Sequence, residues 1–356
     1  MRYQEYDFVF VSQVPVFYKV NLYNSLSDKY KVFVIFLAND TVEKRSSDFF
    51  SLDDLKFDYL MLSNNYLQNR DKIKTIIRIY SILRRIEYRQ LVLCAWDYIE
   101  TWVLSWLFPK SKNAFVLESS IIESKLTGIK KILKKIFLNR IATVYASGSP
   151  HVELLCALEY KGNITKTRGV GLINKKNKLR LNNQPNKKAD YFLFIGRLVR
   201  EKNIALLLDY FRMHSDLKLK IIGEGPLGDI LKKEASANIE FLGSVSNDKI
   251  SNYMDNAIAL VLPSISEPWG LVVEEALLNS CHVLISKNCG VVDLVQDLVP
   301  AQIFDPYDIK DFDRAITKIL TVYGSDQRMT GGPMLIEEKD LEQVSSYDLV
   351  ATRNED

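Results

Sequence analysis

The sequence of 356 residues is poor in the side chains that build disulfide frameworks and metal centres. It contains four cysteines and three histidines, and no two cysteines are spaced as a close pair. Disulfide scaffolds and structural zinc sites commonly use such pairs. We therefore expect free thiols at Cys94, Cys156, Cys281 and Cys289, and we expect neither a metal ion nor a cofactor in the functional site.

Long apolar runs and a cofactor-type glycine motif are also missing. The most apolar stretch, residues 99–108, is shorter than the roughly 20 residues that a membrane-spanning helix needs, so it predicts a buried helix. The N-terminus lacks a basic segment followed by an apolar core, which favours a cytoplasmic protein. Val11-Ser-Gln-Val-Pro15 stands where an oxidoreductase would carry Gly-x-Gly-x-x-Gly. The net charge is only +3, so we expect no nucleic-acid partner.

Apolar runs alternate with helix-type patterns along the whole chain, as is typical of parallel sheets wrapped by helices. The predicted strands of the first half are 8–11, 32–37, 91–95, 114–117 and 143–146. Those of the second half are 191–195, 219–222, 239–242, 258–262 and 283–286.

A polar, basic stretch without apolar periodicity separates the two halves. The sequence therefore predicts an α/β protein with two doubly wound, Rossmann-like domains that face each other across a cleft. We expect a first domain at 1–174, a linker at 175–190 and a second domain at 191–330. The segment 331–356 is either a tail or a helix that starts near Lys339 and crosses back to the first domain.

The segment 264–278 carries two glutamates eight positions apart, Glu267 and Glu275. Pro268 and Gly270 mark a turn, and the following residues have helical spacing, so we expect a helix to begin near Gly270. The free N–H groups at a helix start can hold a phosphate. Glu275 lies roughly 7 Å further along the axis, so hydroxyl groups on either side of a diphosphate can reach the two carboxylates. A nucleotide sugar has this shape, although acidic residues near a helix start, including the adjacent Glu274, also occur for dipole reasons alone.

A second group of polar residues follows the predicted strand 191–195. Gly196 begins a turn, and Arg197 and Lys202 place two cations near the carboxyl end of the strand. Open parallel sheets bind ligands at that edge. Two cations there would stabilise the charge that a departing nucleotide takes up, without a metal ion. A surface loop that is merely rich in cations is the alternative interpretation.

Four motifs in this order resemble the donor half of retaining glycosyltransferase family 4. They are Gly196-Arg-Leu with Lys202, Leu219-Lys-Ile-Ile-Gly-Glu-Gly-Pro226, Phe241-Leu-Gly243, and the pair Glu267 and Glu275 in Glu-Pro-Trp-Gly-Leu-Val-Val-Glu-Glu-Ala. The likeness is specific between about 190 and 295 and looser in the first half. It implies the GT-B fold and a metal-independent hexosyltransferase that uses a nucleoside diphosphate sugar with retention at the anomeric carbon.

The resemblance also implies a role for each matched donor-binding residue. Arg197 and Lys202 would hold the diphosphate, Glu267 the transferred sugar and Glu275 the ribose. The backbone of Gly270 and Leu271 would support sugar and phosphate, and Gly196 would form the turn beside them. Three positions depart from the family pattern: Ser280 replaces a usual glycine, His282 a usual proline, and Cys289 the first of two usual glycines.

The first domain offers fewer candidates. The family often has a histidine near the reacting sugar, but Glu118 stands at the end of the predicted strand 114–117. A carboxylate at that edge can accept a proton from an acceptor hydroxyl or orient the acceptor. We expect His151 to cap or pack at a helix start, and the loop 12–19 to shape the acceptor pocket. The catalytic candidates are thus Glu118, Glu267, Arg197 and Lys202.

Cations crowd two segments of the first domain. Residues 125–140 interleave six cations with apolar residues and predict a basic amphipathic helix, and residues 70–89 hold seven more. Such segments can lie on an anionic membrane surface, while an ordinary solvated helix face is the alternative. Together with a general likeness to bacterial cell-surface polysaccharide enzymes, they lead us to expect peripheral contact with the inner face of a membrane. The expected acceptor is a lipid-linked saccharide of O-antigen or capsule type.

Two further functions remain open on these residues. One is a partner-dependent or non-catalytic subunit that binds a nucleotide sugar, which activity of the isolated protein would exclude. The other is a nucleotide-sugar epimerase on the same fold. An epimerase needs acid and base groups flanking the second carbon of the sugar, and the three scattered histidines disfavour it.

Overall fold

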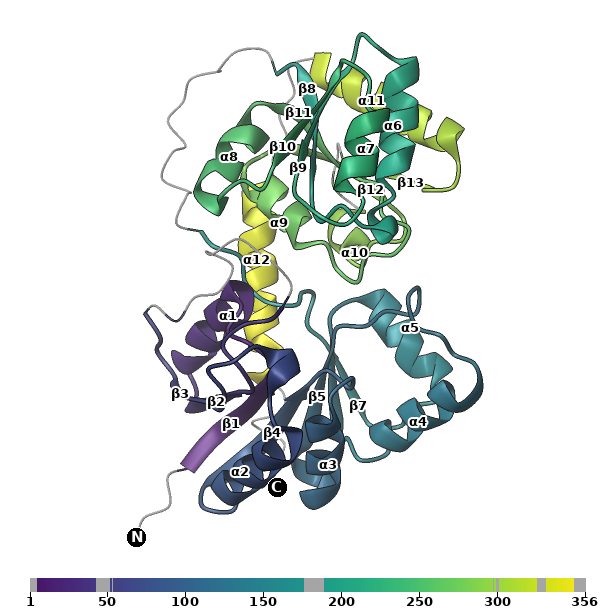
Figure 1. Cartoon of the computed structure of the whole chain (residues 1–356). Helices are drawn as coiled ribbons and strands as arrows, with labels where there is room; N and C mark the ends of the chain where they lie inside the picture. The colour runs from purple at the N-terminus through teal and green to yellow at the C-terminus, as the bar shows by residue number, and fades with distance from the viewer. Residues whose placement is uncertain are drawn as a thin grey trace. The chain divides into compact units, whose positions relative to one another are not determined.

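A computed structural model describes residues 5–42, 52, 54–175, 189–296, 298, 301–324 and 331–348. The chain divides into two units (Figure 1). The first comprises Met1–Leu172 together with Asp340–Asp356, and the second comprises Ile173–Lys339. Most of the expected linker at 175–190 falls outside the described residues.

Within the described residues, the first unit is built on a seven-stranded parallel sheet with the order β3-β2-β1-β4-β5-β6-β7. Its strands are β1 (Glu5–Ser12), β2 (Val32–Phe36), β3 (Asp58–Met61), β4 (Glu87–Cys94), β5 (Asn113–Leu117), β6 (Thr143–Ala146) and β7 (Asn163–Lys166). The five strands that the sequence predicts are confirmed. The edge strands β3 and β7 escape prediction because they are short and largely exposed, and so lack an apolar run.

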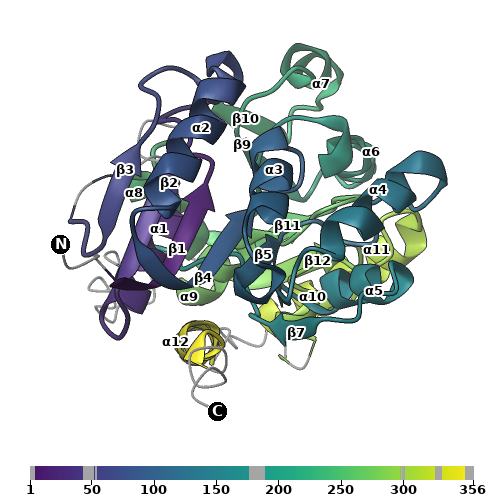
Figure 2. The same ribbon diagram turned by 90° about the horizontal axis from the view of Figure 1, so that it is seen from below.

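Helices cover both faces of this sheet, as the alternating side chains of β1 show. Val9 and Val11 point into a core shared with four helices, while Phe8 and Phe10 point into a core shared with α1 and Tyr347. Figure 2 shows α2, α3, α4 and α5 on one face of the sheet. The helices are α1 (Phe17–Ser27), α2 (Lys72–Leu83), α3 (Ile99–Leu107), α4 (Gly128–Leu138) and α5 (Ser149–Ala157), with short turns η2 (Leu67–Asn69) and η3 (Lys110–Lys112).

The second unit holds a six-stranded parallel sheet among its described residues, with the order β10-β9-β8-β11-β12-β13. Its strands are β8 (Tyr191–Ile195), β9 (Lys218–Ile222), β10 (Ile239–Gly243), β11 (Ala257–Leu262), β12 (His282–Ser286) and β13 (Gln302–Phe304). The helical elements are η5 (Arg200–Lys202), α6 (Ile204–Met213), α7 (Gly228–Glu234), α8 (Asn247–Asp255), α9 (Leu271–Leu278), α10 (Val292–Val295) and α11 (Ile309–Gly324). All five predicted strands are confirmed, and β13 is missed because it has only three residues.

The terminal helix α12 (Gly332–Ser345) starts earlier than the sequence predicts. The Gly-Gly-Pro stretch reads as a break, but Pro333 occupies the first turn of the helix, where proline costs no hydrogen bond. Residues of α12 up to Lys339 belong to the second unit and those from Asp340 to the first. Just beyond the helix, the ring of Tyr347 stacks on Tyr145 with 4.3 Å between centroids.

The prediction of a buried helix at 99–108 is only half right. Helix α3 forms there, and Leu104 and Ser105 are buried, but Trp106 is 57% exposed. The apolar run therefore predicted the helix correctly, but only one side of α3 is covered by the rest of the unit. Among the described residues, no helix combines the length and the apolar character that crossing a membrane requires.

Candidate functional site

The predicted donor residues follow two neighbouring strands of the second sheet. Strands β8 and β11 lie side by side and run in parallel, so the loops after them meet at the same edge. The first loop contains Gly196 to Lys202, and the second leads through Glu267 into α9. A Cβ added to Gly196 would lie 3.6 Å from Lys202 Cε, so the lysine side chain passes close over that turn.

Lys202 and Glu267 are in direct contact. The lysine Nζ forms an ion pair with Glu267 Oε2, and the two side chains are 17% and 12% exposed. Ser264 Oγ donates to the same carboxylate oxygen at 3.4 Å. The backbone N–H of Ile265 donates to the carbonyl of Glu201 at 2.9 Å, which ties the two loops together. A partly buried cation and anion thus lie together at the sheet edge, where a phosphate could share the ammonium and a hydroxyl the carboxylate.

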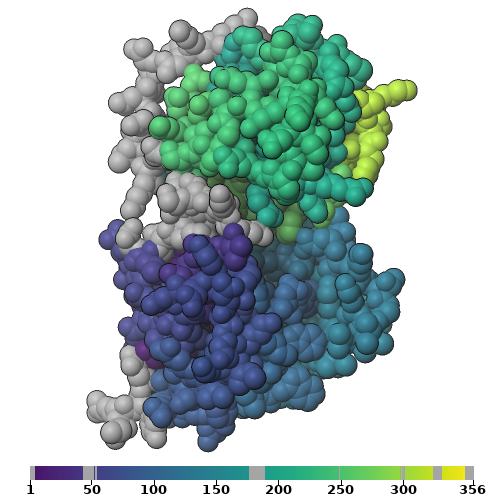
Figure 3. Space-filling model, viewed as in Figure 1, coloured from purple at the N-terminus to yellow at the C-terminus, as the bar shows by residue number. Residues whose placement is uncertain are grey.

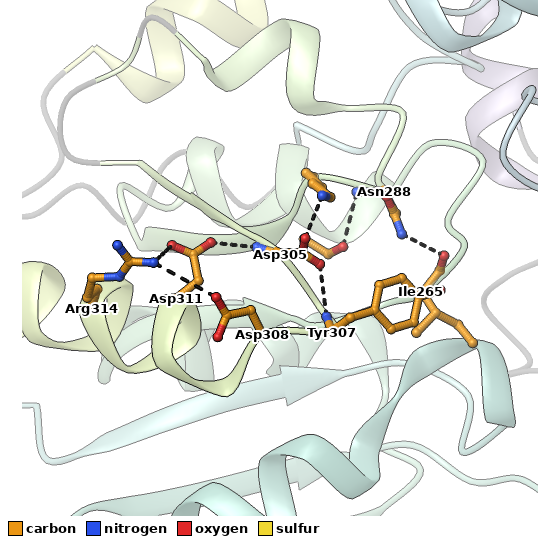
Figure 4. Close-up of polar contacts among 9 residues, drawn as sticks. Ile265, Asn288, Asp305, Tyr307, Asp308, Asp311 and Arg314 are labelled. Atoms are coloured by element: carbon orange, nitrogen blue, oxygen red, sulfur yellow. Dashed lines mark hydrogen bonds and ion pairs between the residues drawn. The ribbon is translucent and has the colours of Figure 1, made fainter.

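The Glu267 turn is fixed by a third loop. Glu267 N–H donates to Asn288 O at 3.2 Å, and Gly290 N–H donates to Glu267 O at 2.9 Å. The side chain of Asn288 donates to Ile265 O at 3.1 Å (Figure 4). A Cβ at Gly290 would lie 1.9 Å from Pro268 O, so only glycine allows this approach. The backbone of Glu267 is therefore fixed on both sides, which positions its carboxylate for the contacts with Lys202 and Ser264.

Helix α9 begins at Leu271, as the sequence predicts, with Gly270 as its N-cap. Gly270 has a φ of 106°, a conformation that residues with a side chain rarely adopt. The N–H groups of the first turn of α9 therefore lie directly after the Glu267 turn. Glu275 is partly buried further along α9, and Arg197 is exposed in the turn after β8. The predicted donor residues all belong to the two loops and the helix at this edge.

Glu274 has a role that sequence reasoning misses. It is fully buried, its Oε1 accepts a hydrogen bond from Trp269 Nε1 at 2.6 Å, and its Oε2 lies 2.8 Å from Lys339 Nζ. Glu274 does lie in the first turn of α9, where a dipole explanation applies, but its side chain also joins the Glu267 turn, through Trp269, to α12. No sequence signal points to Lys339, which lies 65 positions away.

In the first unit, Glu118 lies directly after β5 and forms an ion pair with Lys19 of α1, with 2.7 Å between Nζ and Oε1. Lys19 is buried and also donates to Gln13 Oε1 at 3.2 Å, while Gln13 Nε2 donates to Cys94 O at 3.1 Å. Burial by itself would lower the pKa of Lys19, yet the Glu118 carboxylate raises that pKa above its ordinary value. The expected loop 12–19 thus runs into the first residues of α1, where Lys19 holds Glu118 in place; sequence reasoning did not single out Lys19.

A small pocket lies beside this pair. Its lining includes Thr167, Gln343 and Tyr347 in addition to Lys19 and Glu118. The pocket therefore combines a cation, a carboxylate and an amide, which are the groups that bind hydroxyls.

Two of the histidines, His151 and His282, are buried. His151 of α5 is buried, and its Nε2 lies 3.2 Å from the carbonyl oxygen of Glu118. This agrees with the expected packing at a helix start. His282 is buried at the first residue of β12, which is the opposite end of the strand from the site edge.

The comparison with family models matches residues 175–331 to the family described as glycosyl transferases group 1. This range includes all the predicted donor residues from Gly196 to Glu275. The lipopolysaccharide 1,2-N-acetylglucosaminetransferase of Salmonella typhimurium is 26% identical over 263 residues, which are 68% of this chain and 63% of that protein. The chain spans about half or less of the length of several curated relatives, with 48%, 26% and 42% for three of them.

Two solved structures resemble nearly the whole chain. The lipopolysaccharide outer core galactosyltransferase WaaB, in its apo form, aligns with a TM-score of 0.72 and 16% identity, over 97% of this chain and 98% of that one. Anabaena Alr3699/HepE, in complex with UDP and glucose, aligns with a TM-score of 0.69 and 13% identity over the same shares. At these identities the likeness shows the fold. Residues 175–331, which make up most of the second unit, therefore match the glycosyl transferases group 1 family, and the two parallel sheets have the GT-B fold of the similar structures.

Proposed function

We propose that this protein transfers a sugar from a nucleoside diphosphate sugar to an acceptor hydroxyl, with retention at the anomeric carbon and without a metal ion. The observation that carries the proposal is the Lys202–Glu267 pair in front of the start of α9. An ammonium and free helix N–H groups suit a diphosphate, and a carboxylate suits sugar hydroxyls. The presence of UDP and glucose in the structurally similar Alr3699/HepE supports the same class of donor.

Each residue of this edge has a proposed task. Lys202 and Arg197 neutralise the diphosphate, Glu267 binds the transferred sugar, and Glu275 binds the ribose. The turn at Gly196 and the backbone of Gly270 and Leu271 complete the donor site.

In the reaction, the bond from the anomeric carbon to the diphosphate oxygen breaks, and the acceptor oxygen bonds to the same face of that carbon. The negative charge that develops on the diphosphate is stabilised by fixed cations and N–H dipoles, so the chemistry needs no metal ion. The proton of the acceptor hydroxyl passes to Glu118 or, where Glu118 only orients the hydroxyl, to the departing diphosphate oxygen.

The acceptor that we propose is a lipid-linked saccharide in the assembly of a surface polysaccharide. The support is the named activity of the Salmonella relative, which acts on lipopolysaccharide, and the outer core galactosyltransferase among similar structures.

A thermal-shift screen against UDP-, GDP-, ADP- and dTDP-sugars, with and without EDTA, tests the donor assignment. We expect one nucleotide class to raise the Tm of the wild type, because ligands that bind only the folded state stabilise it, and EDTA should leave the rise unchanged. Lys202→Ala should lose the rise and Glu275→Ala should weaken it. Arg200→Ala, which removes an exposed neighbouring cation, is the matched control and should behave as the wild type.

The opposite outcome would also be informative. If the folded wild type responds to no nucleotide sugar, the donor proposal fails, and a partner-dependent or non-catalytic role takes its place. If every response disappears with EDTA, the donor site stands but the metal-independent mechanism is wrong.

A further inference from the structure

Helix α4 presents its apolar residues outward. Ile129, Ile132, Leu133 and Ile136 are between 40% and 71% exposed. Their spacing of three, four and seven positions puts them on one stripe of the helix, which we call the α4 stripe. The helix is anchored to the unit from its other side, where Phe137 is fully buried and contacts Trp102 of α3.

Two of the four lysines of α4 contact the protein, whereas Lys130 is exposed. Lys134 Nζ lies 4.4 Å from the centre of the Trp96 ring and donates to Ser124 Oγ at 3.0 Å, and burial lowers the pKa of Lys134. Lys135 forms an ion pair with Glu159 at 2.9 Å. A surface helix normally buries its apolar stripe and exposes its charges. The core of the first unit therefore does not account for the α4 stripe.

Helix α2 also carries an outward apolar stripe, and its cations are exposed. Ile73, Ile77 and Tyr80 form a second outward stripe and are between 39% and 71% exposed, whereas Ile79 and Leu83 are buried. We call the three exposed residues the α2 stripe. Because an outward apolar stripe occurs on two helices, it is a property of this face of the unit.

Helix α3 connects the two stripes. The ring of Tyr80 on α2 lies 5.9 Å from that of Phe108 at the end of α3, and α3 in turn contacts α4. All three helices cover the same face of the sheet (Figure 2), and the surface over residues 70–140 is blue in the lower half of Figure 3. The exposed Trp106 of α3 carries the guanidinium of Arg140 over its ring at 4.8 Å.

We propose that this face of the first unit docks on a lipid bilayer that contains anionic headgroups, and that both stripes enter the bilayer interface. The charge pattern selects this occupant. Residues 72–86 hold five cations and residues 125–140 hold six, and neither segment contains an acidic residue. Apolar side chains flanked by cations suit an anionic interface, where tryptophan and arginine are also favoured. A second copy of this chain would bring cations against cations.

The docking proposal is supported by the exposure of the two stripes and by the cations around them. Its connection to a lipid-linked acceptor rests on the proposed function, because only an enzyme that meets its acceptor at a membrane gains from the contact.

Vesicle flotation tests the docking. The probes are phosphatidylcholine vesicles with and without about one-third phosphatidylglycerol. We expect the wild type to float with the anionic vesicles, and less so as salt rises. The triple variant Ile129→Ser, Ile132→Ser and Ile136→Ser should bind the vesicles at least about tenfold more weakly, since it removes most of the apolar surface of the α4 stripe. The control Met213→Ser with Ile230→Ser, two similarly exposed residues of the second unit, should float as the wild type.

Three results would overturn the proposal. The first is failure of the wild type to float with anionic vesicles, and the second is a triple variant that floats as well as the wild type with an unchanged Tm. The third is a dimer in size-exclusion chromatography that the triple variant abolishes, which would make the face a contact between copies. The nucleotide-sugar Tm shift of the triple variant should equal that of the wild type, so failure of the docking and failure of the donor site can be told apart.

Discussion

The two units hold their functional residues in different ways. In the second unit, the Glu267 turn is fixed by backbone hydrogen bonds and by a glycine whose Cβ would clash with a carbonyl. In the first unit, Glu118 is held by the side chain of Lys19. A backbone contact demands glycine and turn residues at set positions, so it leaves a readable motif. A side-chain pair can be built from many residue combinations, which explains why the donor half resembles a family closely and the other half only loosely.

The strongest exception to this contrast is the buried Glu274–Lys339 pair, a side-chain contact at the donor turn. Lys339→Met should lower the free energy of unfolding by about 3–5 kcal/mol, because it leaves a carboxylate buried without its cation. Urea denaturation measures the loss. The double variant Glu274→Leu with Lys339→Met should recover part of it, and Lys318→Met on the exposed side of α11 should change little. A loss below about 1 kcal/mol would show that Glu274 does not need this partner.

The largest losses of activity are expected from substitutions at the donor edge of the second unit. Lys202→Ala and Glu267→Ala should each lower turnover about 10²- to 10³-fold, the effect of removing one stabilising group from a transition state. Because the two side chains touch, the double variant should lose less than the product of both effects. Steady-state kinetics measures these values against Arg200→Ala. Wild-type turnover in both single variants would remove the site assignment.

Glu118→Gln tests whether the first unit acts on the acceptor and not on the donor. We expect sugar transfer to fall by about tenfold or more, because a charged hydrogen-bond partner of the acceptor is lost. The Tm shift with the nucleotide sugar should stay unchanged, since Glu118 belongs to the first unit. Glu159→Gln, an exposed carboxylate of the same unit, is the control. A weaker nucleotide response in Glu118→Gln would contradict the assignment of Glu118 to the acceptor.

The smallest expected effect lies at Ser280, where the family usually has glycine. Ser280 has a φ of 55°, a left-handed conformation that costs residues with a side chain about 1–2 kcal/mol. Ser280→Gly should raise stability by about 0.5–1 kcal/mol after the extra entropy of unfolded glycine is included. Thermal unfolding measures the gain. Lys318→Gly, inside helix α11, should change stability in the opposite direction.

Much of the fold is predictable from local patterns. Apolar runs located ten of the described strands, and the turn at Pro268 and Gly270 located the start of α9. Parallel strands bring their carboxyl ends to one edge, so the order of strands and turns also predicted that Lys202 and Glu267 would share that edge.

Other features depended on the path of the whole chain. Lys339 and Glu274 are 65 positions apart in the sequence, and Lys19 and Glu118 belong to different elements. No local sequence pattern therefore predicts either pair. The exposure of the α2 and α4 stripes also depended on the tertiary structure. Periodicity determined which residues share a face of each helix, but only the tertiary structure decided which face met the core, because that choice depends on what the rest of the chain places against it.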